Sequence, residues 1–190
     1  MKKSQRLVEL KNSGYTQAVI GIDPGVTTGV AVMATKSSFQ SGQVDFRWTR
    51  QLSYGGSGND AQDVHVDDDW PEQHVVELIV SYITVVAEFI DDTHIVIEDF
   101  IVRQFNASRD FLSPVRITAG ILQALFELQL GVQVHVQSPS EAKTTCTDER
   151  MDRWGLTIST LKDRHSRDAE RHCILFIRKS MAKMPQGNRI

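Results

Sequence analysis

Residues 18–33 read AVIGIDPGVTTGVAVM, and this stretch decides the fold of the chain. Its first part is short, apolar and β-branched, a proline-glycine pair interrupts it, and the run GVAVM resumes strand character, which predicts a β-hairpin. Asp23 stands at the end of the first strand, and Gly25 lets a phosphate or a metal ion approach the backbone there. The alternative is that Asp23 only caps the hairpin turn, as aspartate often does.

The segments after this hairpin alternate between strand and helix patterns. Alternating apolar and polar residues predict a third strand, and apolar residues three and four apart predict amphipathic helices that begin near prolines. The expected elements are strands at 44–52, 94–100 and 132–136, and helices at 71–90, 113–130 and 166–181. The order β-β-β-α-β-α-β-α predicts an α/β fold with a central mixed five-stranded sheet and helices on both faces.

The length and composition are those of one ordinary globular domain. The chain has 190 residues, of which 41% are hydrophobic and 24% are charged. We therefore expect residues 1–190 to form a single domain, with an arm or short helix at 1–16 and an acidic mobile loop at 53–70. Two cysteines, Cys146 and Cys173, are too few for a disulfide framework and favour a cytoplasmic protein. Since no long apolar run is found, we expect no export and no membrane association.

The net charge of −3 hides a strong segregation of charge along the chain. Residues 60–99 carry 12 acidic and no basic side chains, whereas both flanking regions are net basic. Because an average over the chain can hide a basic surface, the low net charge does not exclude nucleic acid as a partner.

Further acidic residues lie at the ends of predicted elements. The strand IVIED ends on Glu98 and Asp99, and a carboxylate beside a buried strand is costly unless it is paired or binds a cation. In the segment DRHSRDAERH, His165, Asp168 and His172 stand three and four residues apart, on one face of one helix. The alternatives are a solvent-facing Glu98 and a charged helix face with incidental histidines.

Taken together, these residues are typical of a metal-dependent phosphodiesterase. Three carboxylates at separate element ends would hold two divalent cations about 4 Å apart, one activating water and the other stabilising the leaving oxygen. Oxygen ligands with one imidazole suit Mg²⁺, with Mn²⁺ as a substitute. The predicted catalytic and metal-binding residues are Asp23, Glu98, His165 and Asp168. If Glu98 faced the other side of the sheet, Asp99 would take its place.

The ordered set of motifs resembles the RuvC-like Holliday junction resolvases of the ribonuclease H-like superfamily. VIGIDPGVTTGVAV is similar to the first strand and hairpin of that family, IVIEDF to its central acidic strand, TAGILQALFELQLGVQVHVQSPSEAK to the next helix and strand, and HSRDAERH to its metal-binding helix. The resemblance covers residues 18–178. It implies a ribonuclease H-like fold and a metal-dependent endonuclease that cuts four-way DNA junctions by paired nicks, in host recombination and repair or in bacteriophage genome processing. Asp23, Glu98 and Asp168 match the family's metal carboxylates, and His165 falls where members have His or Asp.

The resemblance also implies contacts to branched DNA. Contacts to phosphate are expected from basic residues after the acidic strand and around the last helices. The candidates are Arg103, Arg109, Arg116, Lys143, Arg164, Arg167 and Arg171. Family members carry an aromatic wedge three residues after the catalytic Glu, but Ile101 stands at that position here. Either Phe100 or Phe105 replaces the wedge, or the wedge is absent.

The resemblance also implies a homodimer. Selecting a four-way junction needs a second copy of the site about a twofold axis, and resolvases of this family are dimers. The helix at 118–130 is apolar nearly all round, so it supplies either the dimer interface or only core.

Three other functions fit parts of the pattern. A ribonuclease H-like nuclease acting on RNA or on other branched DNA would use the same site. A non-catalytic junction-binding module would keep the fold, but the retained carboxylates disfavour it. A phosphotransferase whose hairpin cradles ATP phosphate needs two such domains, and the length of this chain disfavours it.

Overall fold

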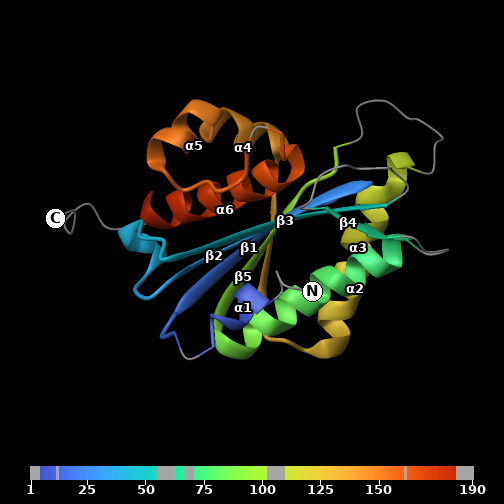
Figure 1. Ribbon diagram of the computed structural model, residues 1–190, viewed down its shortest axis with the longest axis horizontal. Helices are drawn as coiled ribbons and strands as arrows, with labels where there is room; N and C mark the ends of the chain where they lie inside the picture. Colours follow the sequence, from blue (N-terminus) through green and yellow to red (C-terminus); the bar gives the residue numbers. More distant parts are fainter. Residues whose placement is uncertain are drawn as a thin grey trace.

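The protein folds around one mixed β-sheet (Figure 1). The computed structural model describes residues 5–11, 13–54, 63–66, 71–101, 110–160 and 162–182. The strands are β1 (Gln17–Asp23), β2 (Thr27–Thr35), β3 (Phe46–Tyr54), β4 (Asp63–Val66), β5 (Asp92–Glu98) and β6 (Gln133–Gln137), in the order β4-β3-β2-β1-β5-β6. The helices are α1 (Gln5–Val8), α2 (Pro71–Phe89), α3 (Ser113–Leu128), α4 (Pro139–Thr145), α5 (Asp148–Trp154) and α6 (Arg164–Ala182), with 3-10 turns η1 (Phe39–Ser41) and η2 (Asp110–Leu112).

The register of the central strands brings two acidic residues together. β1 and β2 form the predicted hairpin, antiparallel and with Asp23 opposite Gly29. β5 runs parallel to β1 on its other side, with Ile22 paired to Ile97. The next residue of each strand is acidic, so Asp23 and Glu98 lie at the same edge of the sheet. β6 is parallel to β5 and β3 is antiparallel to β2, which confirms the predicted mixed α/β class.

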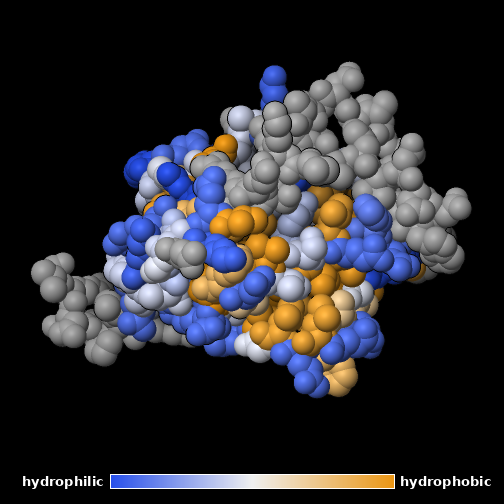
Figure 2. All heavy atoms as spheres, turned by 60° about the horizontal axis from the view of Figure 1, so that its bottom comes forward, coloured by the Kyte–Doolittle hydropathy of each residue, from blue (hydrophilic) through white to orange (hydrophobic). Residues whose placement is uncertain are grey.

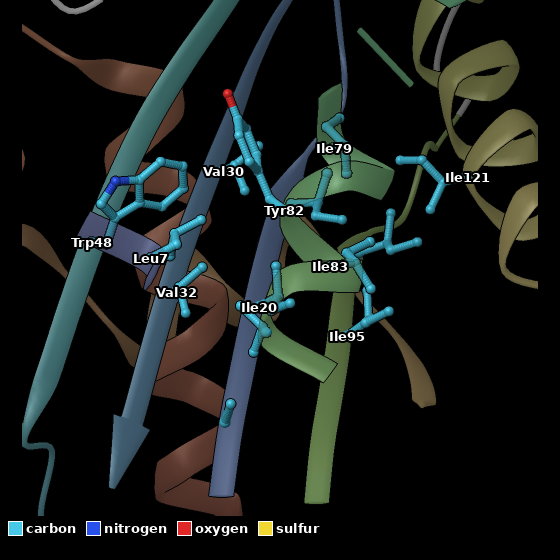
Figure 3. Packing of buried hydrophobic residues seen from close by; sticks show 14 of the residues in the cluster. Leu7, Ile20, Val30, Val32, Trp48, Ile79, Tyr82, Ile83, Ile95 and Ile121 are labelled. Carbon is cyan, nitrogen blue, oxygen red and sulfur yellow. The ribbon is translucent and has the colours of Figure 1, made fainter. Parts of the chain in front are cut away.

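Two apolar cores lie on opposite faces of the sheet, because successive side chains of a strand point to opposite faces. The larger core packs strand residues such as Ile20 against Ile83 of α2 and Ile121 of α3 (Figure 3). The second core packs Val19 and its neighbours on that face against α6, where Cys173 is fully buried. Burying one such aliphatic side chain contributes about 1.5–3 kcal/mol to the free energy of folding, so both cores stabilise the packing of helices on the sheet.

α6 crosses the sheet so closely that two strand positions have no room for a side chain. A Cβ atom on Gly29 would lie 1.9 Å from the carbonyl oxygen of His165, and one on Gly21 would lie 2.2 Å from that of Ala169. Only glycine leaves this space free. The close packing places the first turns of α6, with His165 and Asp168, beside the end of β1.

Several segments differ from the sequence prediction. Residues 63–66, inside the loop expected at 53–70, form the sixth, edge strand β4, which pairs in parallel with β3. Backbone pairing with an existing edge stabilises this strand, and four residues are too few to show a period. The sequence pattern also does not predict α4 and α5, since each has only seven residues and hence no extended apolar stripe. In the arm expected at 1–16, the structure shows the short-helix alternative, α1.

The N-terminal segment belongs to the larger core. Leu7 on α1 and Leu10 just after it are both buried against the rest of that core. No helix in the described ranges is long and apolar enough to cross a membrane.

Candidate active site

Asp23 and His165 meet where β1 ends and α6 begins. His165 Nδ1 lies 2.8 Å from Asp23 Oδ2, and the backbone N–H of His165 donates to Gln51 Oε1 on β3. The Asp23 side chain is 11% exposed, whereas the His165 side chain is 44% exposed. The hairpin turn is closed by Thr28, whose hydroxyl donates to the Gly25 carbonyl. Asp23 therefore contributes its carboxylate to a side-chain cluster and is not the residue that closes the turn.

Negative charge is concentrated around Asp23. Burial raises the pKa of Asp23, and the neighbouring carboxylates of Glu98 and Asp168 raise it further, while the hydrogen bond with His165 lowers it. That same hydrogen bond raises the pKa of His165, against the lowering effect of burial. Three carboxylates, near enough that two of them raise the pKa of the third in a partly buried place, favour a cation, because their mutual repulsion is only partly compensated.

Glu98 is held by a buried histidine. His172 Nε2 donates to Glu98 Oε2 over 2.7 Å, and His172 Nδ1 lies 2.9 Å from Gln137 Oε1 on β6. His172 is fully buried on α6, so Glu98 points to the same face of the sheet as His165. Asp99 follows on an exposed position and is not needed as a replacement.

Asp168 contacts two positively charged side chains. Lys143 Nζ of α4 lies 3.3 Å from Asp168 Oδ2, and Arg171, three residues further along α6, donates to Oδ1. Asp163 lies five residues before Asp168 and is a further carboxylate near the start of α6. It accepts hydrogen bonds from the backbone N–H and the hydroxyl of Thr160. It stabilises the start of the helix and does not join the carboxylate cluster.

Known proteins provide a test of the fold. No protein-family model and no curated protein matches the chain. It is similar to RuvC of Thermus thermophilus in complex with a Holliday junction substrate, with 19% identity, a TM-score of 0.55, and coverage of 88% of this chain and 96% of that one. A second T. thermophilus RuvC structure gives 20% identity and a TM-score of 0.53 over the same shares, 88% and 96%. The yeast mitochondrial Holliday junction resolvase Ydc2 gives 11% identity and a TM-score of 0.52, covering 93% of this chain and 85% of that one.

The chain has a RuvC-like fold. The fold expected from the ordered motifs is therefore confirmed, and its sheet has six strands, one more than the five expected, because β4 adds an edge strand.

The carboxylates gathered on this RuvC-like fold fit a hard divalent cation by their chemistry. Asp23, Glu98 and Asp168 would supply oxygen ligands of the kind that Mg²⁺ prefers, and His165 would supply an imidazole that Mn²⁺ accepts more readily. Across the part of the chain that the structure describes, no three His, Cys, Asp or Glu side chains are already grouped as ligands of a metal ion. Each carboxylate instead contacts a nitrogen of a basic side chain.

Two of the predicted DNA-binding residues are buried in this RuvC-like fold. Arg167 and Arg171 are 5% and 7% exposed. Arg167 is paired with Asp148 and Asp152, and Arg171 is paired with Asp148 and donates to the Cys146 carbonyl. These guanidinium groups join α6 to α5, although both also line the open pocket that contains Asp168, so their contact with DNA stays a prediction. The sequence pattern does not reveal α5, so it does not reveal their acidic partners.

Three other basic residues predicted to bind DNA lie in the described part of the chain. Lys143 and Arg164 are exposed, and both line an open pocket of about 420 Å³ that also contains Asp168. Arg116 pairs with Glu72 at 2.6 and 2.7 Å, which links α3 to α2. The Lys143 and Arg164 side chains therefore carry positive charge beside Asp168.

The aromatic wedge candidates are only partly described. The Phe100 ring packs edge-on against Phe111, with centroids 5.4 Å apart. Phe105, Arg103 and Arg109 lie outside the described residues.

Three residues that surround the carboxylates are not predicted as site residues from the sequence. Gln137 and Gln51 carry no recognisable signal, because an isolated glutamine at a strand end or in a strand is common. His172 does carry one, since it follows Asp168 by four residues and so shares its helix face.

Proposed function

We propose that this protein is a metal-dependent, structure-selective endonuclease that resolves four-way DNA junctions by paired nicks. The observation that carries the proposal is the convergence of Asp23, Glu98, His165 and Asp168 at one edge of the sheet of a RuvC-like fold. One RuvC structure to which the chain is similar contains a Holliday junction substrate. We place the protein in the cytoplasm, in DNA recombination and repair.

The same four residues would hold two Mg²⁺ ions, for which Mn²⁺ would substitute. Bound there, such ions supply an activated water and stabilise the leaving oxygen of the phosphodiester. The chain fixes Asp23 and Glu98 through the register of β1 and β5, so neither depends on a loop for its position. His165 Nδ1 is within hydrogen-bond distance of Asp23 Oδ2, and the neutral imidazole is the form that binds a cation or accepts a proton from water.

The surroundings of the cluster suit a DNA backbone. Lys143 and Arg164 present positive charge in the open pocket beside Asp168. Phosphate contacts of this kind set affinity and position without reading sequence, which is what a structure-selective nuclease requires.

Selection of a junction further requires two copies of the site, and we propose a homodimer formed through α3 and β6. On α3 the buried residues Ile117, Ile121 and Leu125 face the core, so the helix is core on that side. On its other side, large apolar side chains are exposed, and Phe126 is 79% exposed. The exposed apolar residues of α3 and β6 are Val115, Leu122, Phe126, Leu128, Val134 and Val136. Figure 2 shows apolar side chains gathered on the face on which α2 and α3 lie.

Leu122 and Phe126 of α3 and Val134 of β6 line one open pocket, so the apolar surface continues from the helix onto the edge strand of the sheet. β6 is the last strand of the sheet, so one side of it has no neighbouring strand among the described residues. Contiguous apolar surface of this kind marks an interface between proteins.

A panel of labelled substrates tests the proposed function against its rivals. The protein is incubated in Mg²⁺ with a four-way junction, a flap, a linear duplex and an RNA–DNA hybrid. We expect symmetric nicks in two opposed strands of the junction, little cutting of the linear duplex, and no cutting when a chelator is added. Faster cutting of the hybrid or the flap would instead favour the nuclease acting on RNA or on other branched DNA. Tight junction binding without any cutting would favour the binding module.

A further inference from the structure

We propose that His172 is a positioning residue that orients Glu98 for metal binding, an inference that rests on the proposed function and adds a residue to its site. His172 lies on α6, Glu98 ends β5, and Gln137 ends the neighbouring strand β6. The imidazole bridges the two strand ends, with Nε2 2.7 Å from Glu98 Oε2 and Nδ1 2.9 Å from Gln137 Oε1. One buried side chain of the long helix thus connects two strands at the edge where the carboxylates gather.

The contacts of His172 fix its orientation. It is fully buried, and both ring nitrogens have a side-chain partner. A buried imidazole that is bonded at both nitrogens cannot rotate without losing a hydrogen bond and leaving a polar atom unsatisfied. The carboxylate of Glu98 therefore has a partner whose own position is fixed by β6 and α6.

The hydrogen bond still allows Glu98 to act as a metal ligand. A carboxylate has about four lone-pair sites, and the bond from His172 Nε2 uses one site on Oε2. The remaining sites stay available to a cation. A partner of this kind restricts the side-chain rotation that a free glutamate would lose on binding metal, which increases the affinity of the site.

The partner of Glu98 differs from the partners of the other two carboxylates. Asp23 contacts His165, which is 44% exposed and is itself a proposed ligand. Asp168 contacts the half-exposed Lys143 and the buried Arg171, whose guanidinium group is shared with Asp148 of α5. His172 is fully excluded from solvent and belongs to no proposed ligand set. Its contacts with Glu98 and Gln137 therefore fit a positioning role.

The test measures Mn²⁺ binding to the protein without DNA, by isothermal titration calorimetry, for the wild type, His172→Leu and His172→Gln. Leucine fills the space but donates no hydrogen bond, whereas the glutamine amide can still donate to Glu98. We expect Mn²⁺ affinity to fall about 10–100-fold in His172→Leu and most of that loss to be recovered in His172→Gln. A role in packing alone predicts equal affinities for the two variants.

His94→Leu is the matched control. His94 lies on the same strand and face as Glu98, four residues earlier, and its ring packs against Phe176 of α6 with centroids 4.6 Å apart. Its Nδ1 lies 3.1 Å from His135 Nε2, so this variant also removes a histidine–side chain hydrogen bond between β5 and β6. We expect it to keep wild-type Mn²⁺ affinity.

Cleavage gives a second readout. In His172→Leu, the Mg²⁺ concentration for half-maximal cutting of a four-way junction should rise, while the rate at saturating Mg²⁺ should fall much less. If His172→Leu fails to fold, Gln137→Leu keeps both His172 and Glu98 and should still weaken Mn²⁺ binding.

The outcomes separate the two proposals. Wild-type Mn²⁺ affinity in folded His172→Leu, or in Gln137→Leu where it replaces that variant, overturns the positioning role and leaves the proposed function intact. A wild-type protein that binds no Mn²⁺ and cuts no junction overturns the proposed function, and the positioning role with it.

Discussion

His165 Nδ1 lies 2.8 Å from Asp23 Oδ2, although 142 positions of the chain separate the two residues. The contact joins the first turn of α6 to the end of β1 and brings together the helix that carries Asp168 and the strand that carries Asp23.

This contact predicts the titration of His165. Its hydrogen bond with Asp23 raises the pKa of His165 above the ordinary value of 6.5, so the ring keeps its proton to a higher pH than a free histidine. In Asp23→Asn the charge is lost, and the pKa should fall. The measurement is the imidazole chemical shift by NMR as a function of pH, in the presence of a chelator. A midpoint for His165 that is the same in both proteins would show that the contact does not form in solution.

Substitutions of His165 should rank by their ability to bind metal. His165→Asp should retain more cleavage activity than His165→Ala, because a carboxylate can still act as a ligand. The measurement is the initial rate of junction cutting at saturating metal. Wild-type rates in His165→Ala would mean that the site consists of carboxylates alone.

Gly29→Ala tests the close crossing of α6 over the hairpin. The new Cβ would lie 1.9 Å from the His165 carbonyl oxygen, so the start of α6 must move and His165 must move with it. We expect a loss of stability of about 1–3 kcal/mol or more and a strong loss of cleavage. Chemical denaturation and junction cutting measure the two effects. Gly120→Ala is the control, since its Cβ would meet only the Val76 side chain, at 3.0 Å, and should leave cleavage unchanged.

Asp148→Asn tests the link between α5 and α6. The hydrogen bond from Arg167 and the charge of Arg171 hold the pKa of Asp148 below its ordinary value of 3.8. A lowered folded-state pKa means that the ionised carboxylate stabilises the fold above about pH 4, and that this contribution is lost as the pH falls further. Asp148→Asn should therefore be less stable than wild type at pH 7 by about 1–2 kcal/mol, a value reduced by the partial exposure of Asp148.

The difference between the two proteins should shrink toward pH 3, as measured by denaturation midpoints across the pH range. A constant difference from pH 7 to pH 3 would show that the charge of Asp148 is not what joins the helices.

The central strands and their acidic ends could be predicted from the sequence, but the surroundings of the site could not. Asp23 and Glu98 each end an apolar run, and that signal is local. The partners of Arg167 and Arg171 lie on α5, a helix of seven residues, so their burial depends on a tertiary contact that no periodicity reveals. β4 likewise depends on pairing with β3. Predictions failed where a long-range contact decides the structure.

Phe126→Asp tests the proposed dimer surface. The side chain is 79% exposed on α3, so a charge there costs the folded monomer little but would oppose burial between two copies. We expect the wild type to sediment as a dimer in analytical ultracentrifugation, and Phe126→Asp to be largely monomeric with an unchanged melting temperature. Val8→Asp, at an exposed apolar position on α1, should remain dimeric. A monomeric wild type at micromolar concentration would remove the basis for this interface.

The most direct measurement compares cutting and binding of a labelled four-way junction by the wild type, Asp23→Asn and Glu98→Gln in Mg²⁺. Each substitution removes one metal carboxylate and with it several kcal/mol of transition-state stabilisation, so cutting should fall about a hundredfold or more. Binding should be unchanged or tighter, because one negative charge facing the phosphates is gone. Cutting at the wild-type rate in either variant would contradict the assignment of these carboxylates as the catalytic centre.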